Sequence, residues 1–188
     1  MIFFLGGVMN ESVPLFGALI LGFGVLSWWL TGRVRAYALN RLVDVPTARS
    51  SHAHPTPRGG GLAIVLSFLL AVVVLRIGGL VDNVMSSALL VGGGVVGVTG
   101  FVDDHGHVPA RWRLLAHFLA AGGVLVVLYP LAILEIILPG VPTVVAFGFA
   151  LLFLVWSLNL YNFMDGIDGI AGVEAVTTCL AGGAILGF

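Results

Sequence analysis

Six long runs of this sequence contain almost no charged side chain. Crossing the hydrocarbon core of a bilayer takes an apolar helix of about 20 residues, with roughly 17–25 tolerated. The runs are Val13–Gly32, Gly59–Leu75, Asn83–Val102, Leu114–Leu134, Ile136–Met164 and Gly169–Phe188. A water-soluble fold could not bury this much apolar surface, because 59% of the 188 residues are hydrophobic and only 9% are charged. The sequence therefore predicts an all-α, polytopic transmembrane bundle of about six helices, forming a single domain over residues 1–188.

The positive charges are distributed unevenly between the loops that join these runs. Seven of the eight arginines lie in two loops, namely Arg33, Arg35, Arg41, Arg49 and Arg58 in the first and Arg111 and Arg113 in the second. Only Arg76 lies on the opposite side. Because short arginine-rich loops stay in the cytoplasm, we predict that both loops are cytoplasmic and that both termini lie outside. We therefore expect a multi-pass membrane protein whose polar loops face the cytoplasm.

Net charge and cysteine content argue against two other classes of protein. The formal net charge is −1, which gives no electrostatic basis for binding nucleic acid. The single cysteine, Cys179, lies within an apolar run, so neither a disulfide framework nor a thiolate metal site is expected.

Paired carboxylates end the third run. Asp103 and Asp104 are adjacent at its predicted cytoplasmic boundary, where they repel each other unless a cation or hydrogen-bond donors compensate. One interpretation is a pair that handles magnesium or a phosphate group. The other, equally consistent with the sequence, is a solvated pair that ends a helix.

A second polar group interrupts the end of the fifth run. Four oxygen-bearing side chains recur there at every third residue or so, which places neighbours on one helix face. They are Asn159, Asn162, Asp165 and Asp168. Carboxylate and amide oxygens are the ligands that magnesium prefers, and they also suit a ribose or a uracil edge. We therefore favour a functional site over a simple helix boundary, and we leave the role of nearby Glu174 open.

A third group precedes the second run. His52, His54 and a Pro-Thr-Pro turn lead into Arg58, Gly59 and Gly60. Glycine N–H groups at a helix start, together with an arginine, are typical of a phosphate-binding arrangement, whereas the two histidines alone are typical of a loop.

The start of the fourth run carries three more candidates. Arg111 and Arg113 suit either a phosphate contact or the anchoring of a helix at the membrane surface. His117, one turn further along, fits a site role and a packing role equally. In the third run, glycines at 92–94, 97 and 100 predict a flat face that lets neighbouring helices approach closely.

Three motifs in this chain appear in the order found in one known family. They are DVPTARSSHAHPTPRGGG (44–61), GFVDDHGH (100–107) with RWRLLAH (111–117), and NFMDGIDG (162–169). Over about residues 40 to 180 the chain resembles the polyprenyl-phosphate N-acetylhexosamine-1-phosphate transferases, called glycosyltransferase family four. The sequence around Arg49–Gly61 is most similar to that of the bacterial branch that initiates O-antigen synthesis.

The resemblance implies a magnesium-dependent transfer, with manganese as an alternative metal. UDP-N-acetylhexosamine and undecaprenyl phosphate would give a lipid-pyrophosphate-linked sugar and UMP. By this resemblance, Asp103 would deprotonate or position the lipid phosphate, and Asp104 would lie beside the metal. Asp168 would be a magnesium ligand, while Asn162 and Asp165 would hold the nucleotide or order the metal shell. The residues that contact substrate would be Asn159, Arg111, Arg113 and His117, and those that line the entrance would be Arg58, Gly59 and Gly60.

The sequence also departs from this family. Family members have about ten or eleven helices, a Gly-Asp-x-Gly-Ser motif with a further metal aspartate, and a later histidine-rich loop. None of these occurs here, so we predict that the chain corresponds to the N-terminal half and that these 188 residues alone do not catalyse transfer. The sugar and the oligomeric state stay open, with a homodimer as one alternative.

Two other functions remain compatible with the sequence. A transporter would also be a multi-pass bundle, but its charges usually lie near the bilayer midplane and not at one end. A non-catalytic subunit would pair with a separate chain that carries the second half.

Overall fold

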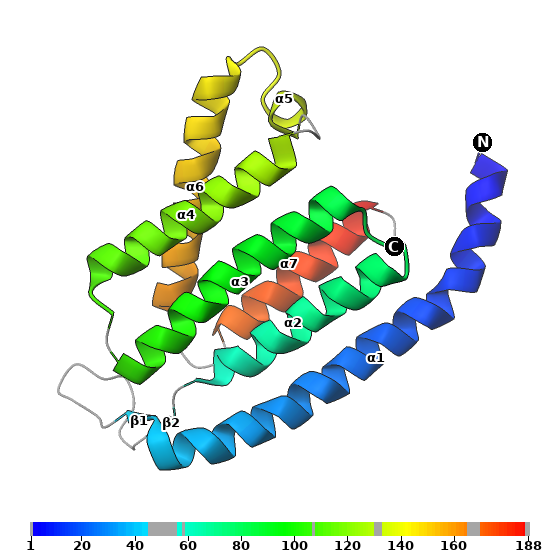
Figure 1. Ribbon diagram of the computed structural model, residues 1–188. Helices are drawn as coiled ribbons and strands as arrows, with labels where there is room; N and C mark the ends of the chain where they lie inside the picture. The colour runs from blue at the N-terminus through cyan, green and yellow to red at the C-terminus, as the bar shows by residue number, and fades with distance from the viewer. Residues whose placement is uncertain are drawn as a thin grey trace.

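The protein is described by a computed structural model that covers residues 2–44, 56–57, 59–106, 108–129, 133–164 and 170–186. Its elements follow one another as α1 (Ile2–Arg41), β1 (Val43–Asp44), β2 (Thr56–Pro57), α2 (Gly60–Ile77), α3 (Asn83–Gly106), α4 (Ala110–Leu128), α5 (Ile133–Ile137), α6 (Thr143–Met164) and α7 (Ile170–Leu186). Apart from the two-residue strands, every element in these ranges is helical, which confirms the predicted all-α bundle (Figure 1).

Five of the helices are long and apolar enough to cross a membrane within the part of the chain that the structure describes. They are Gly17–Arg41 of α1, all of α2, α3 and α4, and Thr143–Phe163 of α6. The sixth predicted span forms α7, which has 17 described residues. At 1.5 Å per residue this helix is about 26 Å long, at the short end of what a bilayer requires.

Three predicted boundaries are wrong. The fourth run was predicted to reach Leu134, but α4 ends at Leu128. Helix α1 does not end at Gly32 but continues to Arg41, because the residues that follow Gly32 include good helix formers such as alanine, leucine and arginine and no proline. The arginines 33, 35 and 41 therefore lie on a helix and not in a loop. The fifth run is also not continuous: it divides into α5 and α6 at the Pro139–Pro142 turn, where Gly140 has a φ of 80°.

The described helices pack in sequence order. Helix α1 lies against α2, α2 against α3, α3 against α4, and α4 against α6, while α7 touches α6 (Figure 1). Short turns enforce this order. Between α2 and α3, for example, Asp82 caps α3 by accepting hydrogen bonds from the backbone N–H groups of Val84 and Met85, at 2.8 and 2.9 Å.

Glycines set the spacing of α3 from its two neighbours. A Cβ atom at Gly97 would lie 2.6 Å from Cγ1 of Val65 on α2, and one at Gly92 would lie 2.6 Å from Cγ2 of Val124 on α4. Neither position has room for a methyl group without separating the helices. The predicted packing role is therefore confirmed for Gly92 and Gly97, but on two different sides of α3. The single flat face is wrong, because an added Cβ at Gly94 or Gly100 would have no atom within 4 Å.

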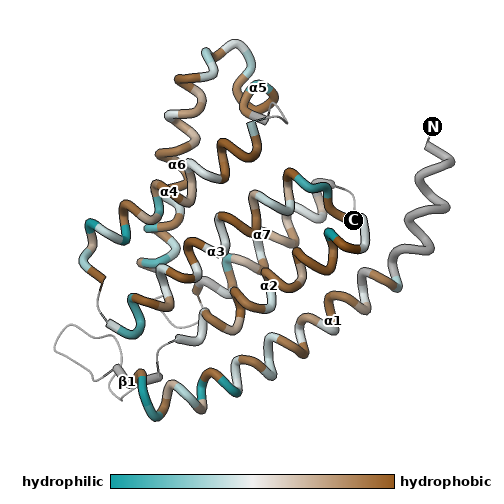
Figure 2. Tube along the Cα trace, viewed as in Figure 1, coloured by the Kyte–Doolittle hydropathy of each residue, from teal (hydrophilic) through white to brown (hydrophobic). Residues whose placement is uncertain are grey.

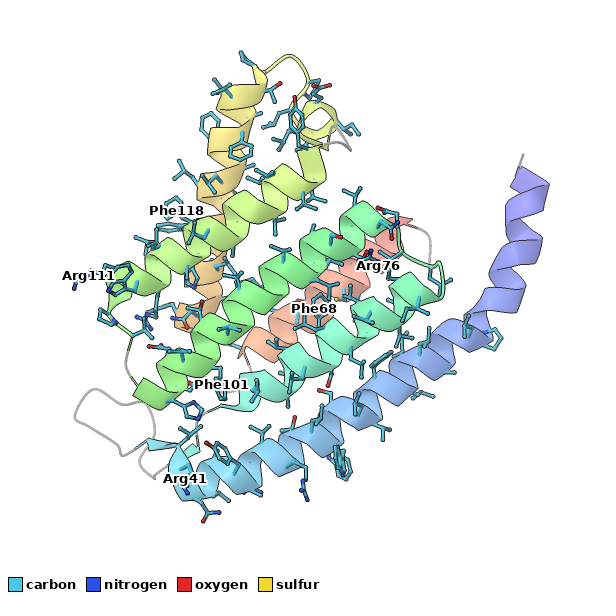
Figure 3. All side chains as sticks on the ribbon, viewed as in Figure 1. Arg41, Phe68, Arg76, Phe101, Arg111 and Phe118 are labelled. Atoms are coloured by element: carbon cyan, nitrogen blue, oxygen red, sulfur yellow. The ribbon has the colours of Figure 1, made fainter. Side chains whose placement is uncertain are left out.

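Polar residues gather at the helix ends and apolar residues cover the spans between them (Figure 2). Large apolar side chains such as Phe149 and Leu119 are about two-thirds exposed, as expected of a surface that faces lipid. Arg41 and Arg111 lie towards one end of the helices and Arg76 towards the other (Figure 3). The beginning of α1 and the end of α7 lie at the Arg76 end (Figure 1), so the first and last described helices have these ends on the same side of the bundle.

Candidate functional site

The candidate site lies at the end of the bundle where α1 and α3 finish and where α2 and α4 begin (Figure 1). We call this region the polar end and define it by Gly59, Asp103, Asp104, Arg113 and His117. Two short strands lie at this end. Strand β1 pairs antiparallel with β2, so that Val43 lies opposite Pro57 and Asp44 lies opposite Thr56. The pairing holds the last residues of α1 next to the first residues of α2.

Asp103 clamps the turn between α3 and α4. Its Oδ2 accepts a hydrogen bond from Nη1 of Arg113 at 2.8 Å, and its Oδ1 accepts one from the backbone N–H of Val108 at 2.9 Å. The ion pair is half-buried, with side-chain exposures of 35% for Arg113 and 27% for Asp103. Both carboxylate oxygens of Asp103 therefore have protein donors, which fits a structural clamp better than a metal ligand.

Asp104 faces a different part of the polar end. A Cβ atom added at Gly59 would lie 3.9 Å from Oδ2 of Asp104 and 3.4 Å from Cδ1 of Leu42. Gly59 is the residue before α2 and has a φ of 94°, a left-handed conformation that glycine adopts without strain. The carboxylate of Asp104 thus lies beside the N-terminus of α2, where the helix dipole stabilises negative charge. The structure confirms that Gly59 and Gly60 begin a helix at the site.

A contact that the sequence did not predict joins α1 to this end of α3. The hydroxyl group of Tyr37 lies 3.2 Å from Nε2 of His105, and Nδ1 of His105 lies 2.8 Å from the carbonyl oxygen of Phe101. Because a carbonyl oxygen can only accept, Nδ1 carries the proton and Nε2 accepts from Tyr37. His105 also packs on the Phe101 ring, with centroids 4.2 Å apart.

The Tyr37–His105 contact could be found only in part from the sequence. His105 directly follows the two aspartates, which is a usable signal. Tyr37 carried none, because the residues after Gly32 were assigned to a loop and not to a continuing helix.

His117 lies one turn deeper in the bundle than Arg113 and is 8% exposed. Asn159 on α6 is its hydrogen-bonding neighbour. The amide nitrogen of Asn159 donates to the carbonyl oxygen of Val155 at 2.7 Å. Nδ1 of His117 is buried and has no hydrogen-bond partner among the described residues.

The remaining predicted residues either lie apart from these contacts or fall outside the described part of the chain. Arg111 lies at the outer edge of α4 (Figure 3), with its guanidinium carbon 5.9 Å from the Trp112 ring centre. Asn162 is exposed on α6 and is not among the described residues that make side-chain hydrogen bonds. Arg58, Asp165 and Asp168, as well as His52 and His54, lie outside the described residues.

Glu174, whose role the sequence left open, joins α7 to α6. Tyr161 donates a hydrogen bond to Oε2 of Glu174, and Thr178 donates to Oε1 at 3.3 Å. The contact braces the two helices that flank residues 165–169. Glu174 is thus held by side chains of its own hairpin.

The magnesium site that the resemblance implies stays a prediction. Within the described ranges, no three His, Cys, Asp or Glu side chains come together in a way that could hold a metal ion. Asp103 accepts hydrogen bonds from Arg113 and Val108, and Asp104 is the second carboxylate at this end. The other predicted ligand, Asp168, is outside the described residues.

These observations define a class: a multi-pass membrane protein with carboxylate, guanidinium, imidazole and amide groups collected at one end of its helices. The chain belongs to glycosyl transferase family 4, since residues 86–187 match that family. The predicted family is thereby confirmed, and the match includes the second and third motifs.

The relatives of this chain are bacterial transferases. It is 30% identical over 185 residues to the decaprenyl-phosphate N-acetylglucosaminephosphotransferase of Mycolicibacterium smegmatis, covering 92% of this chain and 46% of that protein. It is 31% identical over 155 residues to the undecaprenyl-phosphate alpha-N-acetylglucosaminyl 1-phosphate transferase of Escherichia coli, covering 78% and 40%. The chain spans about half the length of these curated relatives. No solved structure matches it.

Proposed function

We propose that this chain takes part in transferring an N-acetylhexosamine-1-phosphate from a UDP-sugar to a polyprenyl phosphate, at the cytoplasmic face of a bacterial inner membrane. In this reaction an oxygen of the lipid phosphate forms a bond to the β-phosphorus of the donor. The bond from that phosphorus to the bridging oxygen breaks, and UMP leaves. The product is a sugar linked to the lipid through a pyrophosphate.

The observation that carries the proposal is the collection of charged and polar groups at one end of an otherwise apolar bundle, in a chain whose relatives are named for this chemistry. A reaction between two phosphorylated substrates needs cations and donors that offset crowded negative charge and align the reacting groups. Arg113 and the N-terminus of α2 supply positive potential there. Magnesium, when bound, would neutralise the phosphates, and Asp104 is the described residue whose position suits such a metal.

The same arrangement supports the proposed orientation. Arg41 and Arg111 lie towards the polar end and Arg76 towards the opposite end (Figure 3). This fits the seven-to-one distribution of arginines between the loops of the sequence, the charge bias that keeps a membrane face in the cytoplasm. UDP-sugars are water-soluble and reach the site from that side. Initiation of O-antigen synthesis, and the resulting place in lipopolysaccharide production, is the branch that the motif around residues 49–61 favours.

A transfer assay tests the proposal. Membranes that contain the chain receive radiolabelled UDP-N-acetylglucosamine, undecaprenyl phosphate and magnesium, and label is counted in the lipid phase. A parallel sample co-expresses the C-terminal half of the Mycolicibacterium smegmatis relative. We expect label only in the second sample, since the 188 residues alone are predicted not to transfer, and we expect the Asp104→Asn variant to lose it.

Each outcome has a distinct meaning. Metal-dependent label from the chain alone would contradict the predicted inactivity and support the function. No label in either sample would contradict the proposed function, provided that the intact relative labels lipid in the same membranes. Uptake of the UDP-sugar into sealed vesicles without transfer would support a transporter instead.

A further inference from the structure

An open hollow of about 460 Å³ lies on the outer side of α1, where the apolar part of that helix gives way to its arginines. Helix α1 is at the edge of the bundle and packs against α2 (Figure 1). Its less exposed residues recur every three or four positions, as at Leu30, Val34 and Ala38, and so form one side of the helix. The hollow lies among the exposed residues, and its lining consists of Trp28, Trp29, Thr31, Gly32, Arg33 and Arg35.

Two tryptophans form the end of the hollow that lies deeper in the membrane. Trp28 is 78% exposed and Trp29 is 55% exposed, as expected of rings at the boundary between acyl chains and lipid headgroups. Gly32 follows them by about one turn, and a Cβ atom added there would have no atom within 4 Å. The glycine therefore leaves the floor of the hollow open to a molecule from the bilayer.

Arg33 and Arg35 supply positive charge at the other end of the hollow. They follow Trp29 and Trp28 by four and seven residues, so each arginine is on the same side of α1 as one tryptophan, about 6 to 10 Å further along the helix. The guanidinium carbon of Arg33 lies 5.9 Å from the Trp29 ring centre, which keeps that charge beside the aromatic wall. Both arginines are exposed, and neither has an ion-pair partner among the described residues.

We propose that this hollow binds one anionic glycerophospholipid of the surrounding bilayer. The lipid phosphate lies at Arg33 and Arg35, and the start of the acyl chains lies over Gly32 against the two tryptophans. Charge favours this occupant over a neutral lipid or an apolar helix, since a guanidinium group binds a phosphate through paired hydrogen bonds.

The position of the hollow favours a phospholipid of the bulk membrane. The hollow opens outward from the edge of the bundle, so the lipids around the protein reach it directly. Its charged end lies on the side of the polar end, because α1 runs on from there to Arg41. A lipid held at this point ties the depth of α1 in the membrane to the anionic lipid content of the adjoining leaflet.

The tryptophans of the hollow can report on the lipid that contacts them. The chain has four tryptophans, so replacing Trp112 and Trp156 by phenylalanine leaves Trp28 and Trp29 as the fluorophores. The 188-residue chain is reconstituted in equimolar phosphatidylcholine and phosphatidylglycerol, with bromine on the acyl chains of one lipid or of the other. Bromine quenches only tryptophans that it touches. We expect stronger quenching by brominated phosphatidylglycerol, with a preference of about fivefold for each arginine that contacts the phosphate.

Matched variants separate a seat in the hollow from a general attraction of anionic lipids. Arg35→Gln should lower the preference about fivefold, whereas Arg76→Gln, the same change at the opposite end of the bundle, should leave it unchanged. Gly32→Leu fills the floor without altering any charge and should also lower the preference. Gly22→Leu is its control, because a Cβ atom there also has no atom within 4 Å and the position lies outside the hollow.

Four results would overturn the inference, which does not depend on the proposed function. Equal quenching by the two brominated lipids would show that no headgroup is preferred. A preference that survives Gly32→Leu would show loose attraction to the arginines and no seat in the hollow. Absence of quenching by either lipid would show that protein, such as a second copy of the chain, covers this face. Relief of the quenching by one equivalent of undecaprenyl phosphate would assign the hollow to that lipid and not to a phospholipid.

Discussion

A methyl group at Gly97 is expected to separate α2 from α3 and lower the stability of the bundle. The added Cβ would lie 2.6 Å from Cγ1 of Val65, whereas ordinary contacts begin at 3.4 Å. Val65 cannot move aside easily, because valine in a helix has one strongly preferred rotamer. Gly94, on the same helix, has no atom within 4 Å of such a methyl group and is the matched control.

The two substitutions differ only in this contact. Replacing glycine by alanine within a helix gains up to about 1 kcal/mol, and Gly94→Ala should show that gain. Overpacking costs about 1–3 kcal/mol, so Gly97→Ala should be less stable than Gly94→Ala by that amount. Combining Gly97→Ala with Val65→Ala returns the lost space, and the two changes should therefore be strongly non-additive.

Unfolding in mixed micelles measures this difference. The chain is purified in dodecyl maltoside, unfolded with increasing sodium dodecyl sulfate, and followed by circular dichroism. The midpoints should fall in the order Gly94→Ala, wild type, Gly97→Ala. If Gly97→Ala were as stable as Gly94→Ala, close packing of α3 on α2 would not depend on the glycine, and the reasoning would be refuted.

Three further predictions concern the polar contacts. Asp103→Asn and Arg113→Gln should each lower the free energy of unfolding by up to about 1 kcal/mol, because the ion pair is partly exposed. A double-mutant cycle should show a coupling energy that weakens with added sodium chloride. Strict additivity of the two changes would contradict the clamp. Tyr37→Phe should reduce the Nδ1-protonated form of His105 in ¹⁵N NMR spectra, whereas Tyr129→Phe, at a site without a described hydrogen bond, should not. Tyr161→Phe should lower the unfolding midpoint, because it removes a hydrogen-bond donor to Glu174. Glu174→Gln keeps an acceptor and should lower the midpoint less. The reverse order would show that the hydrogen bond from Tyr161 does not hold α6 and α7 together.

The sequence predicted best what depends on composition and small residues. Long apolar runs predicted the helical bundle, and the glycines of α3 predicted its close neighbours, because both signals are local and have one physical meaning. The clustering of polar residues at one end followed from the order of the runs and from the positions of the arginines.

The sequence predicted least well where a local signal had two meanings. Arginines after Gly32 can end a span or continue its helix beyond the membrane surface, and here the helix continues to Arg41. That continuation is what brings Tyr37 to His105, a contact 68 residues apart along the chain. The fifth run divides at Pro139 and Pro142, which break helices. The prediction gave more weight to the apolar character of the segment than to these two prolines.

The geometry of a helix explains how two adjacent carboxylates coexist at the polar end. Consecutive residues of an α-helix point about 100° apart, since one turn takes 3.6 residues. Asp103 therefore faces α4, where Arg113 and the Val108 N–H group meet it, while Asp104 faces the N-terminus of α2 beside Gly59. Each negative charge has its own source of positive potential, which relieves the repulsion that the sequence alone implied. The pair is thus divided between two neighbouring helices: Asp103 fixes the turn that positions Arg113 on α4, and Asp104 lies beside the glycine turn that begins α2.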